Sequence, residues 1–415
     1  MSNAPKIQEN EPPRRFRILA LLAVAELLGM SLWFTASAGR EHLATLWNLD
    51  SGQIGWLTTA VNLGFVVGTA LAAVFNLADI LPGKRFFTLA AVFGAAANAA
   101  LLVAPGFQTA LVLRFLTGVC LAGVYPPAMK MVATWFKSSR GLAVGTVVGA
   151  LTIGKATPYL IRAVAGESWR SIVMTTSGAA LLAAVLVTAG YSDGPFAFSR
   201  RPFSWRLAGV VWTDRRTRLA VGGYLGHMWE LYAMWTWVPA FLTASFAAWS
   251  ATENHRLPTW ADEAVAFGTI AAGGLGCVWG GYVADRIGRA RLVNQAMAIS
   301  GACCLLVGWT FGGNPWWVLT IALVWGFFVV ADSAQFSTMV TEVAPSHAVG
   351  TALTLQTSIG FLLTTATIQL VPSLVERWDW PWAFPILALG PAAGIAAILR
   401  FEIAGSDAAN QRIAK

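Results

Sequence analysis

His227 and Glu230 stand three residues apart in the long apolar run 219–247 of this 415-residue chain. On a helix, that spacing places both side chains on one face. Histidine titrates near neutral pH, and burial favours the neutral form of a carboxyl group, so the pair is suited to binding and releasing a proton. Tyr232 and Trp235 follow within two turns and are candidates to line a substrate cavity. The alternative is that His227 is an ordinary core residue whose hydrogen bonds are satisfied within the protein.

A third titratable group, Glu26, interrupts the first apolar run. It lies nine residues beyond Arg17, which is about 14 Å along a helix at 1.5 Å per residue. An ionisable group so deep in a membrane is costly and marks a functional site by default. Glu26 is therefore expected to carry a proton or to pair with a buried cation. With His227 and Glu230 it completes the predicted proton-coupling set.

Other polar side chains interrupt the apolar runs, and we interpret them as substrate ligands. Lys155 and Asp332 carry charge at depth, although Lys155 can also extend its ammonium toward the membrane surface. The amides Asn62 and Gln356 have a structural alternative, which is hydrogen bonding between helices. The predicted substrate-binding set is Arg114, Lys155, Asn62, Tyr232, Trp235, Asp332 and Gln356.

The composition defines the environment of these groups. The chain is 56% hydrophobic and 12% charged, whereas soluble domains are about 25% charged. A water-soluble fold cannot cover its surface with so few charges. The net charge of +8 does not indicate nucleic-acid binding, because the basic residues alternate with apolar runs and form no patch. The four cysteines show neither metal-ligand nor disulfide spacing, so no metal or cofactor is expected.

We find twelve apolar runs long enough to cross a bilayer as helices. The first resembles a signal peptide, with Ala36-Ser37-Ala38 in place of a cleavage site. Because Glu26 interrupts it and eleven runs follow, we expect an uncleaved transmembrane helix. The runs lie near 18–38, 54–75, 86–106, 109–134, 141–163, 171–191, 219–247, 263–284, 292–311, 316–343, 348–372 and 381–400.

The loops between the runs predict the orientation. With a cytoplasmic N-terminus, cytoplasmic segments hold twenty Lys and Arg residues and outer segments hold five. This asymmetry follows the rule that positive loops stay inside. Both termini are then cytoplasmic, in a bacterial inner membrane. The polar link 192–218 separates an N-terminal unit, 1–191, from a C-terminal unit, 219–415, with six runs each.

The two units share an internal repeat. The loop "GYVADRIGRARL" (281–292) follows the eighth run, and "NLADILPGKRFF" (76–87) follows the second. Asp79 then corresponds to Asp285, at an offset of about 206 residues. "SWRSIV" at Ser168 and "WPWAFP" at Trp380 form a second pair at a similar offset. Parallel halves of this kind are the plan of one large transporter class.

"GYVADRIGRARL" closely resembles the signature loop of the major facilitator superfamily, a glycine followed by Ala-Asp-Arg-x-Gly-Arg. "RFLTGVCLAG" (114–123) and "WFKSSRGLAVG" (135–145) are similar to further motifs of that family. The resemblance covers the whole chain. It implies an all-α membrane protein with twelve transmembrane helices in two pseudo-symmetric six-helix bundles, working by alternating access as a monomer. It also implies that helices 1 and 4 adjoin, so that Arg114 is the expected partner of Glu26.

In that family the signature loop lies where the halves meet on the cytoplasmic face. The resemblance implies that its charges pair when this side is shut and separate when it opens. The alternative for the arginines is that they only anchor the loop inside. In the first copy, Asn76 and Ile80 replace the leading glycine and the arginine. The expected cytoplasmic gate comprises Asp79, Lys84, Arg85, Gly281, Asp285, Arg286, Gly288 and Arg289.

Transport is the predicted function, and no enzymatic activity is expected. The sequence contains no phosphate-binding GxxxxGK[ST] motif, so an ion gradient is the expected energy source, with protons favoured by Glu26 and His227. Arg114 and Lys155 favour a small anion as substrate, and "LGMSLWFTASA" and "YPPAMKMVATWF" resemble bacterial cyanate and nitrate carriers. A proton/drug antiporter is the main alternative. A non-transporting receptor or scaffold is a remote one. Besides substrate and protons, the lipid bilayer is the expected partner.

Overall fold

The computed structural model describes residues 12–136, 140–166, 168–196, 204–345 and 347–413. Within these ranges all regular secondary structure is helical. The first half contains α1 (Arg15–Met30), α2 (Thr35–Ala38), α3 (Arg40–Trp47), α4 (Ser51–Val74), α5 (Leu77–Ile80), α6 (Gly83–Ala99), α7 (Phe107–Leu121), α8 (Tyr125–Ala133), α9 (Arg140–Ala165) and α10 (Trp169–Gly190). The second contains α11 (Ala208–Thr213), α12 (Arg215–Glu253), α13 (Ala261–Ile287), α14 (Arg289–Leu306), α15 (Pro315–Ala331), α16 (Ser333–Val343), α17 (Val349–Trp378) and α18 (Leu389–Ile413).

Among the described residues, ten helical segments are long and apolar enough to cross a membrane. Two further helices, α1 with 16 residues and α12 with 39, are not among the ten. The protein is therefore an all-helical membrane protein. The ten segments are Ser51–Val74, Gly83–Val103, Phe107–Ala133, Gly141–Ala165, Trp169–Gly190, Ala261–Ile287, Arg289–Thr310, Pro315–Val343, Val349–Trp378 and Trp380–Gly405.

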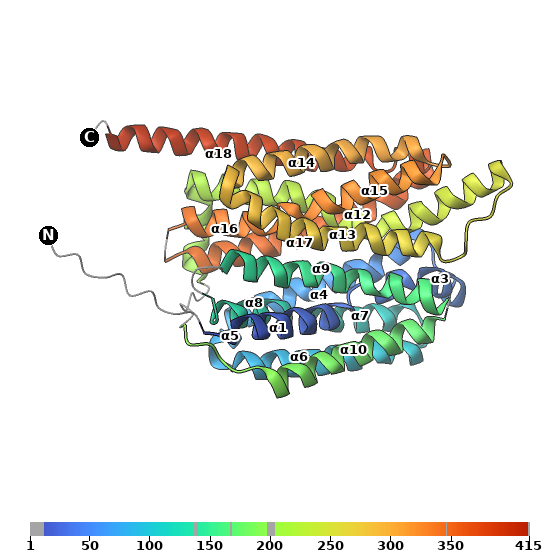
Figure 1. Ribbon diagram of the computed structural model, residues 1–415, viewed down its shortest axis with the longest axis horizontal. Helices are drawn as coiled ribbons and strands as arrows, with labels where there is room; N and C mark the ends of the chain where they lie inside the picture. The colour runs from blue at the N-terminus through green and yellow to red at the C-terminus, as the bar shows by residue number, and fades with distance from the viewer. Residues whose placement is uncertain (1–11, 137–139, 167, 197–203, 346, 414–415) are drawn as a thin grey trace.

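The helices pack in two sets with matching contacts. In the first set, α1 packs against α9 and α10, α4 against α7, and α6 against α7 and α10. In the second, α12 packs against α17 and α18, α13 against α15, and α14 against α15 and α18. The sets meet where α9 packs along α13 and α4 along α17. Figure 1 shows α14 and α18 on one side of the molecule, α6 and α10 on the other, and α9, α13 and α17 between them.

The long helices run side by side between two ends of the molecule. We call these the α3 end and the α5 end, after the short helices that lie there (right and left in Figure 1). The first turn of α1 and the C-terminal end of α18 both lie at the α5 end.

The crossing of α9 and α13 is unusually close. A Cβ atom at Gly149 would lie 2.7 Å from the carbonyl oxygen of Gly274, and one at Gly274 would lie 2.8 Å from that of Gly149. Small residues allow such an approach between membrane helices. The two sets therefore touch, backbone to backbone, at this point.

Several helices break at mid-length, and the breaks position aromatic and charged side chains. The chain leaves helical geometry between α1 and α2, which sets the place of Trp33. Pro126 and Pro127 lie in the first turn of α8, just after α7 ends. Proline is tolerated there because its missing N–H group would have no helical partner, whereas inside a helix it breaks the hydrogen-bond ladder. Asp332 separates α15 from α16.

Candidate functional site

A central cavity of about 90 Å³ lies between the two helix sets. Its lining includes Lys155 of α9, Tyr232 and Trp235 of α12, Trp33 from the break after α1, and Phe361 of α17. A larger cavity of about 490 Å³ is lined by residues of α8, α9, α13, α14 and α16. The two cavities share four lining residues, so the central cavity adjoins the α5 end: Tyr125, Val148, Ser333 and Ser337.

Lys155 is 2% exposed and is surrounded by aromatic rings. Its ammonium donates to the hydroxyl of Tyr232 at 2.5 Å. The same nitrogen lies 3.7 Å from the ring centroid of Trp33 and 5.1 Å from that of Trp235. Ring faces attract a cation, and the attraction is stronger when both groups are desolvated. The structure thus brings together three of the predicted substrate ligands, Lys155, Tyr232 and Trp235.

Sequence reasoning missed Trp33, which is fully buried against Lys155. Twenty tryptophans are spread along the chain, so composition alone did not single it out. The sequence feature that could have identified Trp33 is its position in "LGMSLWFTASA", only seven residues beyond Glu26.

Arg114 holds the helix break that carries Trp33. Its guanidinium donates to the carbonyl oxygen of Leu32 at 3.0 Å, to that of Trp33, and to Oδ1 of Asn98 at 3.2 Å. Neither carboxylate oxygen of Glu26 has a hydrogen-bond partner among the described residues. The expected Glu26–Arg114 pair is therefore not formed, because the backbone carbonyls left free at the break compete for the guanidinium. Arg114 does not line the central cavity.

Glu26 is fully buried on α1. It interacts electrostatically with Lys155 on the adjacent helix α9. The acid of the first helix is thus associated with the cavity lysine instead of with Arg114.

His227 and Glu230 have separate sets of partners despite their spacing. Glu230 accepts hydrogen bonds from Ser300 Oγ at 2.9 Å and Trp325 Nε1 at 2.5 Å, and Cys304 Sγ lies 3.2 Å away. His227 Nδ1 lies 3.0 Å from Oδ1 of Asp332. Glu230 is held by neutral donors of α14 and α15, whereas His227 and Asp332 form a buried pair. None of the three lines the central cavity.

The predicted amide ligands are both buried and lie outside the residues that line the central cavity. Asn62 Nδ2 donates to Thr364 Oγ1 at 2.9 Å, joining α4 to α17 across the two sets. Neither amide atom of Gln356 has a hydrogen-bond partner among the described residues.

The predicted gate residues of the signature loop lie at the α5 end. Gly281, Asp285 and Arg289 line the larger cavity there. Arg289 lies 3.8 Å from Asp285, 2.9 Å from Glu342 and 2.9 Å from Gln335. These contacts stay within the second helix set, and the Asp285 side chain is 67% exposed.

The remaining gate residues are dispersed around the same end. Arg286 lies over the ring of Tyr282 at 4.0 Å. Gly288 has a φ of +92° between α13 and α14, a backbone conformation that favours glycine. Lys84 donates to the carbonyl oxygen of Tyr191 at 3.2 Å, and Arg85 is exposed. The side chain of Asp79 lies outside the described residues.

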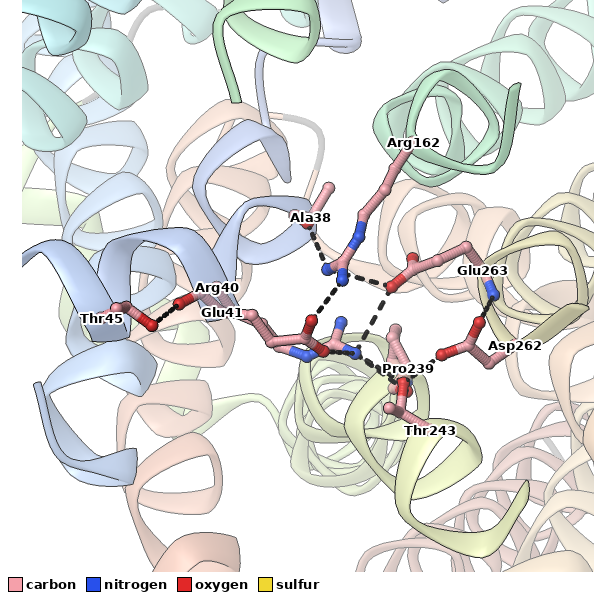
Figure 2. Close-up of polar contacts among 9 residues, drawn as sticks. All are labelled: Ala38, Arg40, Glu41, Thr45, Arg162, Pro239, Thr243, Asp262 and Glu263. Atoms are coloured by element: carbon pink, nitrogen blue, oxygen red, sulfur yellow. Dashed lines mark hydrogen bonds and ion pairs between the residues drawn. The ribbon is translucent and has the colours of Figure 1, made fainter. Parts of the chain in front are cut away.

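An ion-pair network, buried except for Glu41, occupies the α3 end (Figure 2). Arg162 of α9 lies 2.6 Å from Glu41 of α3 and 3.1 Å from Glu263 of α13. Arg40 lies 3.4 Å from Glu263 and donates to Thr243 of α12 at 2.8 Å. The network therefore joins the two helix sets. Arg40 and Arg162 are two of the five cations that sequence reasoning counted in the outer segments, with no further role. The acids Glu41 and Asp262-Glu263, which lie at the ends of the same apolar runs, were the missed signal.

An aromatic layer separates this network from the central cavity. Phe34 lies 6.3 Å from Tyr159 and 6.2 Å from Trp235, between ring centroids, and all three are buried. Arg162 follows Lys155 by seven residues, about 10 Å along α9. A cavity of about 490 Å³ beside the network shares no lining residue with the central cavity. The central cavity is thus cut off from the α3 end.

A helical membrane protein with a partly polar cavity between two helix sets has the organisation of a secondary transporter. A sequence model of the Major Facilitator Superfamily matches residues 20–368. The chain belongs to that family of transporters.

Curated relatives extend this finding. The chain is 22% identical over 408 residues to the probable sulfoacetate transporter SauU of Cupriavidus necator, covering 88% of this chain and 90% of the relative. It is 22% identical over 384 residues to the cis,cis-muconate transport protein of Acinetobacter baylyi, covering 86% of each. A shorter match, 35% identical over 91 residues, relates it to the niacin transporter NiaP of the same organism, covering 21% of this chain and 20% of the relative.

Proposed function

We propose that this transporter carries a small organic anion together with a proton across the bacterial inner membrane. The observation that carries the proposal is Lys155, whose ammonium is the one charged group among the described residues that line the central cavity. A buried cation without a lining acid favours an anionic ligand. The printed names of the relatives support the proposal, because sulfoacetate, niacin and muconate are all organic acids.

The architecture that we propose adds α1–α2 and α12 to the ten candidate spans, giving twelve. They form two six-helix bundles, 1–191 and 219–415, joined by the link 192–218. The matching contacts in the two helix sets support this division. The cavity lies between bundles of one chain, which supports a monomer.

We propose that the α5 end faces the cytoplasm, with both termini on that side. The cations of the signature loop, Arg286, Arg289 and Arg291, support this orientation. The structure then corresponds to a state in which the central cavity adjoins the cytoplasmic end and the outer end is shut. In alternating access, the opposite state requires the network at the α3 end to separate.

Glu26 is the residue that we propose for proton coupling. When ionised, it offsets the charge of Lys155; when protonated, it leaves that charge free for an anionic substrate. A proton and an anion therefore bind together and move in the same direction. The pair of His227 and Asp332 is a second candidate for the proton, and the three donors around Glu230 support a structural role for that acid.

The experiment uses purified protein in liposomes that contain a pH-sensitive dye. Carboxylates such as nicotinate, muconate and sulfoacetate are added outside one at a time, followed by lipophilic cations such as tetraphenylphosphonium. We expect internal acidification with at least one carboxylate. Lys155→Ala is expected to abolish the response, and Lys155→Arg, which keeps the charge, is expected to retain part of it.

Glu26→Gln separates binding from coupling. We expect this variant to bind the anion without a pH response, because its side chain is permanently neutral. A pH response to lipophilic cations alone, lost in Glu26→Gln, would overturn the proposal in favour of proton/drug antiport.

A further inference from the structure

We infer that the central cavity selects planar monocarboxylates, with the carboxylate on Lys155 and the flat part of the molecule among the aromatic rings. This inference rests on the proposed function, which states only that the cargo is an anion. It adds two requirements, a single negative charge and a flat shape. Each follows from separate features of the cavity.

The charge requirement follows from the cations near the cavity. Lys155 is the one charged residue among the described lining residues. The other buried arginines are already engaged: Arg114 with carbonyl oxygens at the helix break, and Arg40 and Arg162 with the acids of the α3 end. A second negative charge on the cargo would therefore be buried without a counterion, which is strongly unfavourable in a low-dielectric site.

The carboxylate fits because residues that line the cavity carry unused hydrogen-bond donors. The ammonium of Lys155 has three N–H groups, and Tyr232 accepts one of them. The indole Nε1 atoms of Trp33 and Trp235 are buried and have no hydrogen-bond partner among the described residues. A carboxylate is acceptor-only, with room for about four hydrogen bonds. An acceptor-only group complements this lining, whereas an alcohol or amine would add further donors.

The shape requirement follows from the rings and the small volume. Phe361 lies 4.9 Å from Phe65 and 5.0 Å from Tyr232, between ring centroids, and Trp33 lies 5.7 Å from Tyr232. Such rings accept a further flat ring in an offset or edge-to-face arrangement. The cavity volume of about 90 Å³ is below the ~150 Å³ of a cavity known to hold benzene. Any ring therefore displaces some of these side chains when it binds. A puckered saturated ring requires a larger displacement than a flat one.

The test is a binding series by calorimetry on the full-length protein in nanodiscs. Benzoate is the planar monocarboxylate, and cyclohexanecarboxylate has the same charge and a saturated ring. Terephthalate adds a second carboxylate, and benzamide removes the charge. We expect benzoate to bind at least tenfold more tightly than each of the other three.

Three variants connect the selectivity to the rings. Trp33→Leu is expected to bring the ratio of benzoate affinity to cyclohexanecarboxylate affinity near one, whereas Trp33→Phe keeps a ring and retains the preference. Phe361→Leu repeats the test on another helix, so that a fold defect in one variant does not decide the result. The readout is a ratio within one preparation and does not depend on the folded fraction.

The outcomes separate this inference from the proposed function. Equal binding of benzoate and cyclohexanecarboxylate, or terephthalate binding as tightly as benzoate, overturns the inference and leaves anion transport intact. If Trp33→Leu and Phe361→Leu both keep the wild-type ratio, the rings do not select the shape. If no carboxylate binds and benzamide does, the proposed function fails.

Discussion

The two ends of the helix bundle contain similar charged side chains in opposite environments. At the α3 end, Glu263 is 4% exposed and lies near two arginines, Arg40 and Arg162. At the α5 end, the Asp285 side chain is 67% exposed and is 3.8 Å from Arg289 on the same side of the interface. Charges interact far more strongly where water is excluded than where it screens them. The buried pairs of the α3 end are therefore expected to interact more strongly than the exposed pair of the α5 end.

The two ends also differ in the helices that their charges connect. The network at the α3 end joins α3 and α9 to α12 and α13, and so it links the two sets. The described contacts of Arg289 stay within the second set. Four substitutions test this difference, taken from the largest expected effect to the smallest.

Glu263→Gln is expected to open the α3 end. It leaves Arg40 and Arg162 buried with less negative charge, and removing one member of a buried pair costs about 3–5 kcal/mol. Labelling of Ser37→Cys by a membrane-impermeant maleimide, with the native cysteines replaced, should accelerate more than tenfold. Glu253→Gln, an exposed acid at the same end, is the matched control. An unchanged labelling rate in Glu263→Gln would show that the network does not hold this end.

Gly149→Ala is expected to destabilise the crossing on which both ends depend. The new Cβ atom would lie 2.7 Å from a backbone oxygen of α13, and overpacking costs about 1–3 kcal/mol. The control is Gly145→Ala on the same helix, where the Cβ atom would lie 3.6 Å from its nearest neighbour. That variant should gain up to about 1 kcal/mol from helix propensity. Thermal unfolding in detergent should therefore move in opposite directions; a shared direction contradicts the prediction.

Glu41→Gln is expected to have a small effect in the same network. The Glu41 side chain is 48% exposed, and an ion pair with such an exposed member is worth about 1 kcal/mol or less. The Ser37→Cys labelling rate should rise by no more than about fivefold. The effect should shrink further as salt is added. An effect as large as that of Glu263→Gln would mean that burial does not set the strength of these pairs.

Asp285→Asn is expected to leave substrate binding nearly unchanged in the state described here. Surface substitutions away from special contacts stay within about 0.5 kcal/mol, which corresponds to roughly twofold in affinity. If the signature loop shuts the α5 end in the opposite state, transport should slow while binding is retained. Calorimetry and liposome uptake measure the two quantities. Weaker binding would place Asp285 in the cavity function instead of in a gate.

The sequence predicted the helical membrane class because that property depends on composition and on the length of each apolar run. It also named Lys155, Tyr232 and Trp235 as substrate ligands; the structure places these three side chains together in the central cavity, and their role in binding stays a prediction. Both predictions use depth along a single helix, which the 1.5 Å rise per residue supplies. The expected single helix over 18–38 is instead broken after Met30.

Partners on other helices were harder to predict, because depth gives no information on the direction of a side chain around its helix. Glu26 and Arg114 had suitable depths and charges, yet Arg114 is bonded to carbonyl oxygens at the break that carries Trp33. His227 and Glu230 share a helix face but contact different neighbours. The α3-end network was missed for a related reason. In the sequence, charges at the ends of apolar runs have the same pattern as loop anchors, and only the packing of the helices shows which of them become neighbours.

Helix α9 carries the cavity lysine, the crossing glycine and an arginine of the α3-end network. Pro158 lies within it, between Lys155 and Arg162. Proline has no N–H group, so the carbonyl of Gly154 lacks its helical partner there, and such sites are where helices bend. In mechanical terms, α9 is two stiff segments joined at a point of reduced bending stiffness. A force applied at Lys155 therefore reaches the glycine crossing through rigid helix, but reaches Arg162 only through this compliant joint.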